Sequence, residues 1–367
     1  MIKLAVPDIG REELDEVKKV FDSKYLVQGD KVEKFENQIK KYVNVKNVIA
    51  VSSGTAALHL ALLAMEVKLG DEVIVPDFTF PATANVVEIV GATTKFVDIK
   101  LDSLCIDVDK IESMITNKTK VIIPVHEFGQ SADMDKIINL AKKYNLKVIE
   151  DAACALGSEY KGKKVGTIGD LGCFSLHPRK AITTGEGGIV VTNNDELAER
   201  IRIFRNHGLS YRDGQPKFVT AGLNYRMTNI QGAIATVQMK KIEMINKKKI
   251  ELATQYNNLL KDVKGITLPK EKKYGKHSWQ TYHIILDEKY DRDKVIGILK
   301  EKGIESNFGA YSVHQQPYYK EKYGYSDYEF SNSIYAHRHG VALPLHSFLL
   351  SKEIIYIVLE LEKILNE

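Results

Sequence analysis

Cysteine is scarce in this 367-residue chain, which contains only Cys105, Cys154 and Cys173. The number is odd, and no two of the three cysteines form a CxxC pair. This pattern argues against a disulfide framework or a zinc ribbon, and it favours the reducing environment of the cytoplasm.

Long apolar runs are also missing. No stretch approaches the roughly 20 residues that a membrane-spanning helix needs, and the N-terminus lacks the apolar run of a signal peptide. Blocks of lysine and arginine with interleaved aromatic residues are absent, and the net charge is only +4. We therefore expect neither a membrane partner nor a nucleic-acid partner. No set of metal ligands stands out, so no metal is expected.

The composition is that of a globular protein, with 44% apolar and 27% charged residues. Short apolar segments alternate with helical patterns up to about residue 192. This alternation predicts an α/β fold with a mostly parallel central sheet flanked by helices. The predicted strands are Val73–Val75, Thr94–Val97, Val121–Val125, Lys147–Glu150, Gly172–His177 and Ile189–Thr192.

The last third of the chain has a different pattern. A long helical segment covers Ile230–Leu260, and a short strand follows at Tyr282–Leu286. Further helices are predicted at Asp293–Lys302 and Lys352–Leu365. We therefore predict a large domain of residues 1–240 and a smaller C-terminal α+β domain of residues 241–367.

Two residues with distinctive chemistry follow predicted strands. Asp151 ends the apolar segment Val148–Asp151, and Lys180 comes between a strand and a glycine-rich turn. Ligands of parallel sheets bind outside the carboxyl ends of the strands, where both residues would lie. A lysine and an aspartate so placed are what pyridoxal 5'-phosphate (PLP) needs. The lysine amine forms a Schiff base, and the carboxylate keeps the pyridine nitrogen protonated.

A possible phosphate site lies at Ser53, Gly54 and Thr55, which open a predicted helix. Free N–H groups and the helix dipole favour an anion there, and glycine lets the phosphate approach the backbone closely. Serine and threonine at such a position are also common as an ordinary helix N-cap. The sequence leaves both interpretations open, although the presence of Lys180 and Asp151 favours phosphate binding.

Eight segments, in this order, resemble one protein family. They are Ala5–Gly10, Leu26–Gly29, Ser52–Ala61, Asp77–Asn85, Val125–Gln130, Val148–Ala153, Thr183–Gly188 and Asn224–Gly232. Together they resemble the DegT/DnrJ/EryC1/StrS sugar aminotransferases, which belong to the fold-type I, aspartate-aminotransferase-like PLP enzymes. The resemblance covers nearly the whole chain.

The resemblance implies a role for further residues around PLP. Lys180 and Asp151 would be the catalytic pair, and the Ser175 hydroxyl would join the phosphate site. Phe80 would stack on one face of the pyridine ring, and Ala153 would pack on the other. Many relatives have glutamine or histidine at the position of Cys154, where the side chain bonds the phenolic oxygen of PLP. A thiol is a weak donor, so this chain departs from that pattern.

The resemblance also implies a homodimer with shared active sites. Asn224 would reach the PLP phosphate of the neighbouring subunit. Arg226 and His314 would contact the diphosphate of a nucleotide-linked sugar, since arginine suits phosphate recognition. A surface arginine and a loop histidine with a purely structural role are the alternative.

The expected activity is transfer of an amino group from glutamate to a nucleotide-linked 4-keto-6-deoxy sugar for a surface polysaccharide, as in perosamine-type synthases. Relatives with histidine at the position of Lys180 dehydrate their substrates, and the lysine here favours a transaminase. A 3-keto-sugar or keto-inositol aminotransferase is the first alternative. A PLP-binding regulatory protein, which would show no turnover with glutamate, is the second.

Overall fold

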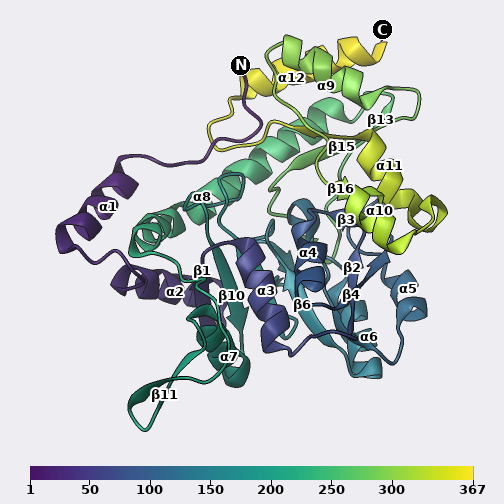
Figure 1. Cartoon of the computed structure of the whole chain (residues 1–367). Coiled ribbons are helices and arrows are strands. Elements are labelled where there is room, and N and C mark those ends of the chain that lie inside the picture. Colours follow the sequence, from purple (N-terminus) through teal and green to yellow (C-terminus); the bar gives the residue numbers. More distant parts are fainter. Residues whose placement is uncertain (367) are drawn as a thin grey trace.

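The computed structural model describes residues 1–366 and has a seven-stranded sheet at its centre (Figure 1). Strand β10 is antiparallel to both of its neighbours, whereas the five strands from β9 to β4 pair in parallel. The predicted mostly parallel sheet is therefore confirmed. In spatial order the strands are β1 (Asn47–Val51), β10 (Gly188–Thr192), β9 (Leu171–Ser175), β6 (Lys147–Asp151), β5 (Thr119–Ile122), β2 (Glu72–Pro76) and β4 (Thr93–Val97).

Helices cover both faces of this sheet. Successive strand residues point to opposite faces, so Ile49 and Ala50 of β1 belong to two different apolar cores. The first core includes residues of α2 (Asp30–Val43) and α6 (Met134–Tyr144). The second includes residues of α3 (Gly54–Ala64), α4 (Ala82–Ile89) and α7 (Asp195–Arg205). Burial on both faces explains why the strands read as nearly continuous apolar runs.

The long helix α8 (Asn229–Leu260) joins the two parts of the molecule. Its first half packs against α1 (Arg11–Ser23) and α2, whereas Leu252, Tyr256 and Leu260 belong to a third apolar core. That core contains β13 (Ile266–Thr267), β15 (Tyr282–Leu286), β17 (Gly340–Leu343), α9 (Arg292–Glu301) and α12 (Ser351–Asn366). The smaller C-terminal α+β unit is thus present, and the proposed division after residue 240 falls inside α8.

The first residues of the chain lie against this C-terminal unit. Ile2 bridges Ile304, and the carbonyl oxygen of Leu4 accepts a hydrogen bond from the N–H of Leu345. Figure 1 accordingly shows both termini at the same end of the molecule. The N-terminal segment then continues to α1 and passes the loop that carries Lys180.

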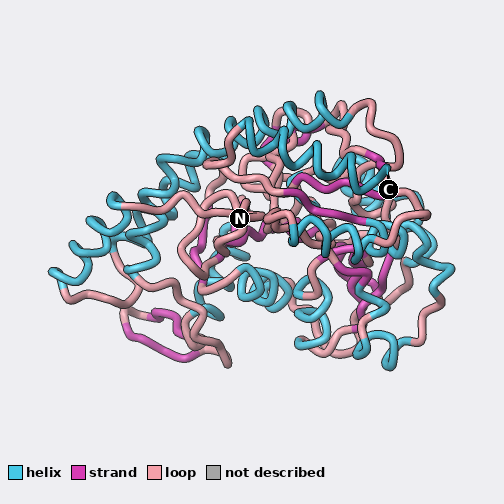
Figure 2. The backbone as a smooth tube through the Cα atoms, turned by 90° about the horizontal axis from the view of Figure 1, so that it is seen from above, coloured by secondary structure: helices cyan, strands magenta, loops and turns pink. Residues whose placement is uncertain are grey.

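Several smaller elements complete the fold, and most were not predicted. A hairpin of β11 (Leu209–Arg212) and β12 (Gln215–Phe218) stands away from the body, as Figure 2 shows from above. The others are β3 (Phe78–Thr79), β7 (Glu159–Tyr160), β8 (Lys163–Lys164), β14 (Gly275–Lys276), β16 (Tyr311–Ser312), α5 (Val108–Ile111), α10 (Pro317–Tyr323) and α11 (Ser331–His339).

Two predicted strands extend too far, since Gly172–His177 runs two residues past the end of β9 and Val121–Val125 runs past the end of β5. The segment Val121–Val125 leaves the sheet after Ile122, because Pro124 has no N–H to donate. Val125 instead makes an isolated bridge to Asp151. Within residues 1–366, no helix is both long enough and apolar enough to cross a membrane.

Candidate active site

Lys180 lies on the loop that follows β9, and its amine is 2.9 Å from the sulfur of Cys154. The N–H of Lys180 donates to the carbonyl oxygen of His177, which fixes the turn. Burial acts to lower the pKa of Lys180, but Cys154 and the carboxyls of Glu127 and Asp151 outweigh burial and raise it. Without a ligand the amine is therefore a cation held among acidic groups.

Asp151 is buried at the end of β6 and accepts two hydrogen bonds. One comes from the Thr83 hydroxyl at 2.7 Å, and the other comes from the Ala153 N–H at 3.1 Å. Burial raises the pKa of Asp151 in spite of these donors and of the nearby Lys180 charge. A buried carboxylate of this kind gains stability from a cationic partner, such as a protonated pyridine nitrogen.

The predicted phosphate site has the geometry of a helix N-terminus. The Ser53 hydroxyl caps α3 by accepting from the Ala56 N–H at 3.0 Å, so the N-cap role is real. Within residues 1–366, the N–H groups of Gly54 and Thr55 have no acceptor, and they remain free for an anion. A Cβ atom on Gly54 would lie only 2.9 Å from the Cβ of Ser175. The structure thus brings Ser175 directly against the start of α3.

Phe80 and Ala153 are both linked to Asp151. The Phe80 ring is 67% exposed and begins the turn that leads to Thr83, whose hydroxyl contacts Asp151. Ala153 donates its N–H to the same carboxylate. Ala153 therefore contacts the buried carboxylate directly, whereas Phe80 is connected to it only through the turn to Thr83. An exposed aromatic ring and a small residue are side chains that suit the two faces of a flat heteroaromatic ring such as that of PLP.

The Asn224–Arg226 segment lies beside the start of α3 in its own chain. The carbonyl oxygen of Tyr225 accepts from the Ser52 N–H at 2.9 Å, and Arg226 bridges Val51. The Asn224 side chain is exposed, and the Arg226 guanidinium donates to the Asn206 side chain at 2.5 Å. Reach into a neighbouring subunit remains a prediction.

His314 is buried, and both of its ring nitrogens are engaged. Nδ1 lies 2.7 Å from a carboxylate oxygen of Asp77, and Nε2 lies 3.3 Å from Asp327. Burial lowers the pKa of His314, but these two carboxylates outweigh burial and raise it. The structure therefore does not bring a free nitrogen of His314 into the Lys180 site, and its contact with substrate also remains a prediction.

Three residues near Lys180 were not found from the sequence. Thr83 anchors Asp151, and Glu127 and Lys249 are buried groups whose charges interact with Lys180. Burial, reinforced by Asp151, raises the pKa of Glu127 to about 8. Glu127 lies within the recognised segment Val125–Gln130, which could have signalled it, whereas nothing in the sequence sets Lys249 apart from the neighbouring lysines.

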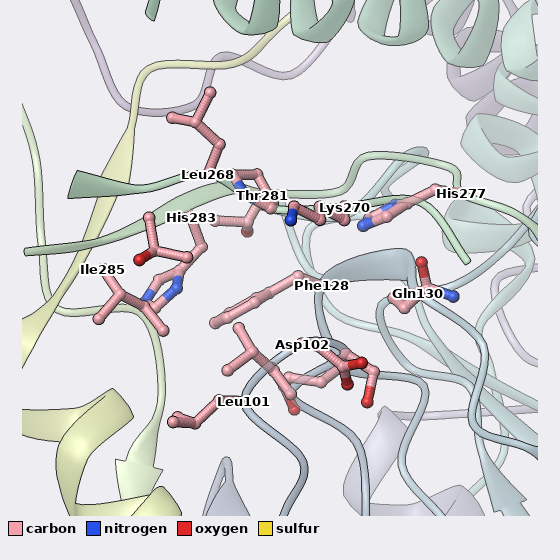
Figure 3. Close-up of a pocket in the computed structure, with 15 residues that line it drawn as sticks. Leu101, Asp102, Phe128, Gln130, Leu268, Lys270, His277, Thr281, His283 and Ile285 are labelled. Atoms are coloured by element: carbon pink, nitrogen blue, oxygen red, sulfur yellow. The ribbon is translucent and has the colours of Figure 1, made fainter. Parts of the chain in front are cut away.

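A cavity of about 90 Å³ lies beside the site rather than in it. Its lining includes Glu127 but neither Lys180 nor Asp151. Figure 3 shows Phe128 and His283 side by side in it, between Leu268 and Leu101, and their rings stack at 4.7 Å. This lining mixes apolar and polar side chains, and it does not bring together the lysine and the aspartate that amino transfer needs.

Comparison with known proteins gives consistent matches along the whole chain. A model of the DegT/DnrJ/EryC1/StrS aminotransferase family matches residues 7–362. An uncharacterized protein of Methanocaldococcus jannaschii is 40% identical over 98% of this chain and 97% of its own length. The spore coat polysaccharide biosynthesis protein SpsC of Bacillus subtilis is 36% identical over 93% of this chain and 91% of its own length.

Solved structures agree with these matches. The PLP form of the putative sugar aminotransferase Spr1654 from Streptococcus pneumoniae superimposes with a TM-score of 0.93. It is 29% identical, and the alignment covers 99% of this chain and 98% of that one. The fold and the cofactor predicted from the sequence are therefore confirmed.

Proposed function

The chain belongs to the DegT/DnrJ/EryC1/StrS aminotransferase family, and on that premise we propose which reaction this PLP-dependent sugar aminotransferase performs. It transfers the amino group of glutamate to a nucleotide-linked 4-keto-6-deoxy sugar that enters a surface polysaccharide. The main observation that supports amino transfer is that Lys180 and Asp151 both follow strands at the carboxyl edge of one sheet. The similarity to a spore coat polysaccharide biosynthesis protein supports the proposal that the amino sugar is used for a surface polysaccharide. The cytoplasm, with its reducing conditions, suits three free cysteines.

Four groups of this chain would hold PLP. The free N–H groups of Gly54 and Thr55, with the hydroxyls of Ser53 and Ser175, would bind the phosphate. Asp151 would pair with the pyridine nitrogen. Phe80 and Ala153 would cover the two ring faces, and Cys154 would lie near the phenolic oxygen.

When bound, PLP supplies a carbonyl that bonds amines and a ring that accepts electron density. The chain supplies the proton transfers. Asp151 would keep a proton on the ring nitrogen, because its buried carboxylate forms no ion pair within residues 1–366. The Nζ atom of Lys180 would hold the cofactor and, when free, would move the proton between the reacting carbon atoms.

The substrate can be tested by offering the purified enzyme glutamate and a panel of nucleotide-linked keto sugars. We expect a product whose mass corresponds to replacement of the 4-keto oxygen by an amino group. Conversion of only 3-keto sugars or keto-inositols would move the assignment to those substrates. Complete absence of turnover with every acceptor and with glutamate would contradict the enzymatic proposal and favour a regulatory protein.

Cys154 provides a prediction about the phenolic oxygen contact. Burial raises the pKa of its thiol despite the nearby Lys180 charge, so the side chain is a weak neutral donor. We expect Cys154→Ser to retain activity within about threefold, and Cys154→Gln to bind PLP at least as tightly, since a neutral hydrogen bond contributes about 1 kcal/mol. PLP affinity and turnover measure this. Complete loss of turnover in a PLP-loaded serine variant would assign the thiol a chemical role.

A homodimer is part of this proposal because apolar side chains are exposed on α1 and on the β11–β12 hairpin. In α1, Leu14 and Phe21 are 60% and 56% exposed. In the β11–β12 hairpin, Tyr211 and Phe218 are also exposed. Large apolar side chains exposed in this way suit a surface that a partner covers, and a twofold axis would use the same surface twice.

Mixing two inactive variants tests whether the sites are shared. If Lys180 and Asn224 serve one site from different chains, a dimer of Lys180→Ala with Asn224→Ala has one intact site. Activity should then return to about a quarter of the wild-type value when exchange is random, because half of the dimers carry one intact site of two. Initial rates after subunit exchange measure this. Exchange without recovery, together with a crippled Asn224→Ala enzyme, would place Asn224 in the site of its own chain.

A further inference from the structure

A second crevice has Lys180 in its lining and is bordered by four separate segments of the chain. We call it the Lys249 crevice. It is lined by residues 5–8, by residues 178–181 and 183, by Gln238, Ile245 and Lys249 of α8, and by residues 345–347. Its volume of about 10 Å³ is that of a single water molecule. Only the end of a ligand could enter it.

Lys249 is the unusual feature of this crevice. Its side chain lies on α8 and is only 5% exposed. Among residues 1–366 its amine makes no hydrogen bond and no ion pair, although a buried charge normally has a partner. Burial, followed by the Lys180 charge, lowers its pKa to about 8, so the amine is still mainly protonated at neutral pH.

His346 adds a second unpaired polar group. It is 7% exposed, and both ring nitrogens are buried without a hydrogen-bond partner in the described part of the chain. The carbonyl oxygen of Lys3 is close enough to act to raise the pKa of the ring, but it does not meet the geometry of a hydrogen bond. Burial, together with the Lys249 charge, lowers the pKa of His346, so the neutral ring offers one N–H donor.

The remaining charges leave the crevice without an available anion. Asp8 is its one acidic lining residue, and that carboxylate is 3.3 Å from the amine of Lys241. Arg179 is exposed at the border, and its guanidinium has no carboxylate partner among residues 1–366. Two unpaired cations, the Lys180 amine and one neutral donor therefore surround a space whose lining offers no available counter-charge. Leaving a buried cation unpaired is costly, and an anionic ligand offsets that cost.

We propose that the Lys249 crevice binds a carboxylate group of the amino-acid donor. This inference rests on the proposed function, in which glutamate is the donor. Lys180 lines the same crevice, so a carboxylate held by Lys249 and His346 keeps the rest of the donor beside the amine-transferring residue. The small volume excludes a sugar ring or a nucleotide, whereas a planar carboxylate matches two or three converging N–H donors.

Lys249→Met tests this assignment, because methionine keeps the length of the side chain and removes its charge. The reaction of the PLP-loaded enzyme with glutamate alone, followed by absorbance, gives the glutamate concentration for half-maximal rate. We expect this concentration to rise about tenfold or more in Lys249→Met, since a charge-assisted hydrogen bond is lost. The maximal rate should change less than about threefold. Lys249→Arg should restore much of the affinity, and Lys247→Met, an exposed lysine of the same helix, should behave as wild type.

A binding measurement separates this inference from the proposed function. Glutarate, which has no amine to transfer, should raise the melting temperature of the wild-type protein and of Lys247→Met, but not that of Lys249→Met. Chloride at equal ionic strength should have a smaller effect. Unchanged glutamate dependence and an unchanged glutarate shift in Lys249→Met would overturn the assignment, as would equal stabilisation by chloride. If Lys249→Met does not fold, His346→Phe takes its place with the same expectations.

Failure of the proposed function has a different signature. A wild-type enzyme that does not react with glutamate contradicts the choice of donor, yet the glutarate measurement still decides whether the crevice binds a carboxylate. If the wild-type enzyme reacts with glutamate and Lys249→Met depends on the glutamate concentration in the same way, only the assignment of the crevice is contradicted.

Discussion

Replacing Lys180 with alanine is expected to abolish both the covalent attachment of PLP and amino transfer. Alanine has no amine to bond the cofactor and no group to carry the proton between the reacting carbon atoms. Loss of a positioned acid–base group alone lowers a rate by roughly 10²–10⁴-fold. Since attachment is lost as well, turnover should fall by about 10⁴-fold or more. Initial rates and the visible absorption of the purified protein measure the two effects.

Borohydride reduction identifies the attached lysine directly. In the wild-type enzyme the reduced cofactor should be found on the peptide that contains Lys180. Lys249 could compete for the cofactor, because it is buried nearby and its pKa is lowered to about 8, which increases the fraction of nucleophilic neutral amine. Mass spectrometry that places the adduct on Lys249 would contradict the assignment of Lys180. Lys163→Ala, at an exposed lysine, is the matched control and should behave as wild type.

Replacing Asp151 with asparagine should slow the chemistry far more than it affects folding. The amide cannot hold a proton on the pyridine nitrogen, and each pKa unit lost there corresponds to about 1.4 kcal/mol. A loss of about two units would slow proton transfer roughly a hundredfold. Single-turnover rates with glutamate measure this step separately from substrate exchange.

Folding of Asp151→Asn should be unimpaired for a specific reason. Asparagine can still accept from the Ala153 N–H, and its amide can donate to the Thr83 hydroxyl, which rotates freely. Burial raises the pKa of Asp151, so its ionised form destabilises the unliganded protein above that pKa. The melting temperature of PLP-free Asp151→Asn should therefore equal or exceed that of the wild type. Wild-type turnover in this variant would show that another group pairs with the ring nitrogen.

Much of the architecture could be predicted from the sequence, because the sheet is buried on both faces. Continuous apolar segments such as Ile189–Val191 are typical of strands in a sheet that is covered on both faces. The strand at Tyr282–Leu286 has the bounds that were predicted for it. The two-residue strands and the β11–β12 hairpin were missed, since they are short and the hairpin is exposed. Their sequences carry no apolar periodicity.

The site was only partly predictable, because some of its contacts join residues that are far apart in the sequence. Asp151 and Gly54 stand in segments whose local order resembles a known family, and Lys180 comes just before such a segment, so all three could be selected from the sequence. The burial of His314 between Asp77 and Asp327 could not be foreseen, because its partners are 237 and 13 residues away. A histidine predicted to face a ligand is thus occupied by carboxylates of its own chain.

The sequence by itself determined the fold class, the cofactor and the lysine and aspartate assigned to it, because these depend on local order and periodicity. Tertiary structure alone decided which other polar groups lie beside Lys180. Lys249 belongs to a run of lysines on one helix, and only the packing of α8 against residues 5–8 and 345–347 buries this one and leaves it unpaired. Burial of a polar side chain depends on elements that are distant in sequence, and no local pattern encodes their arrangement.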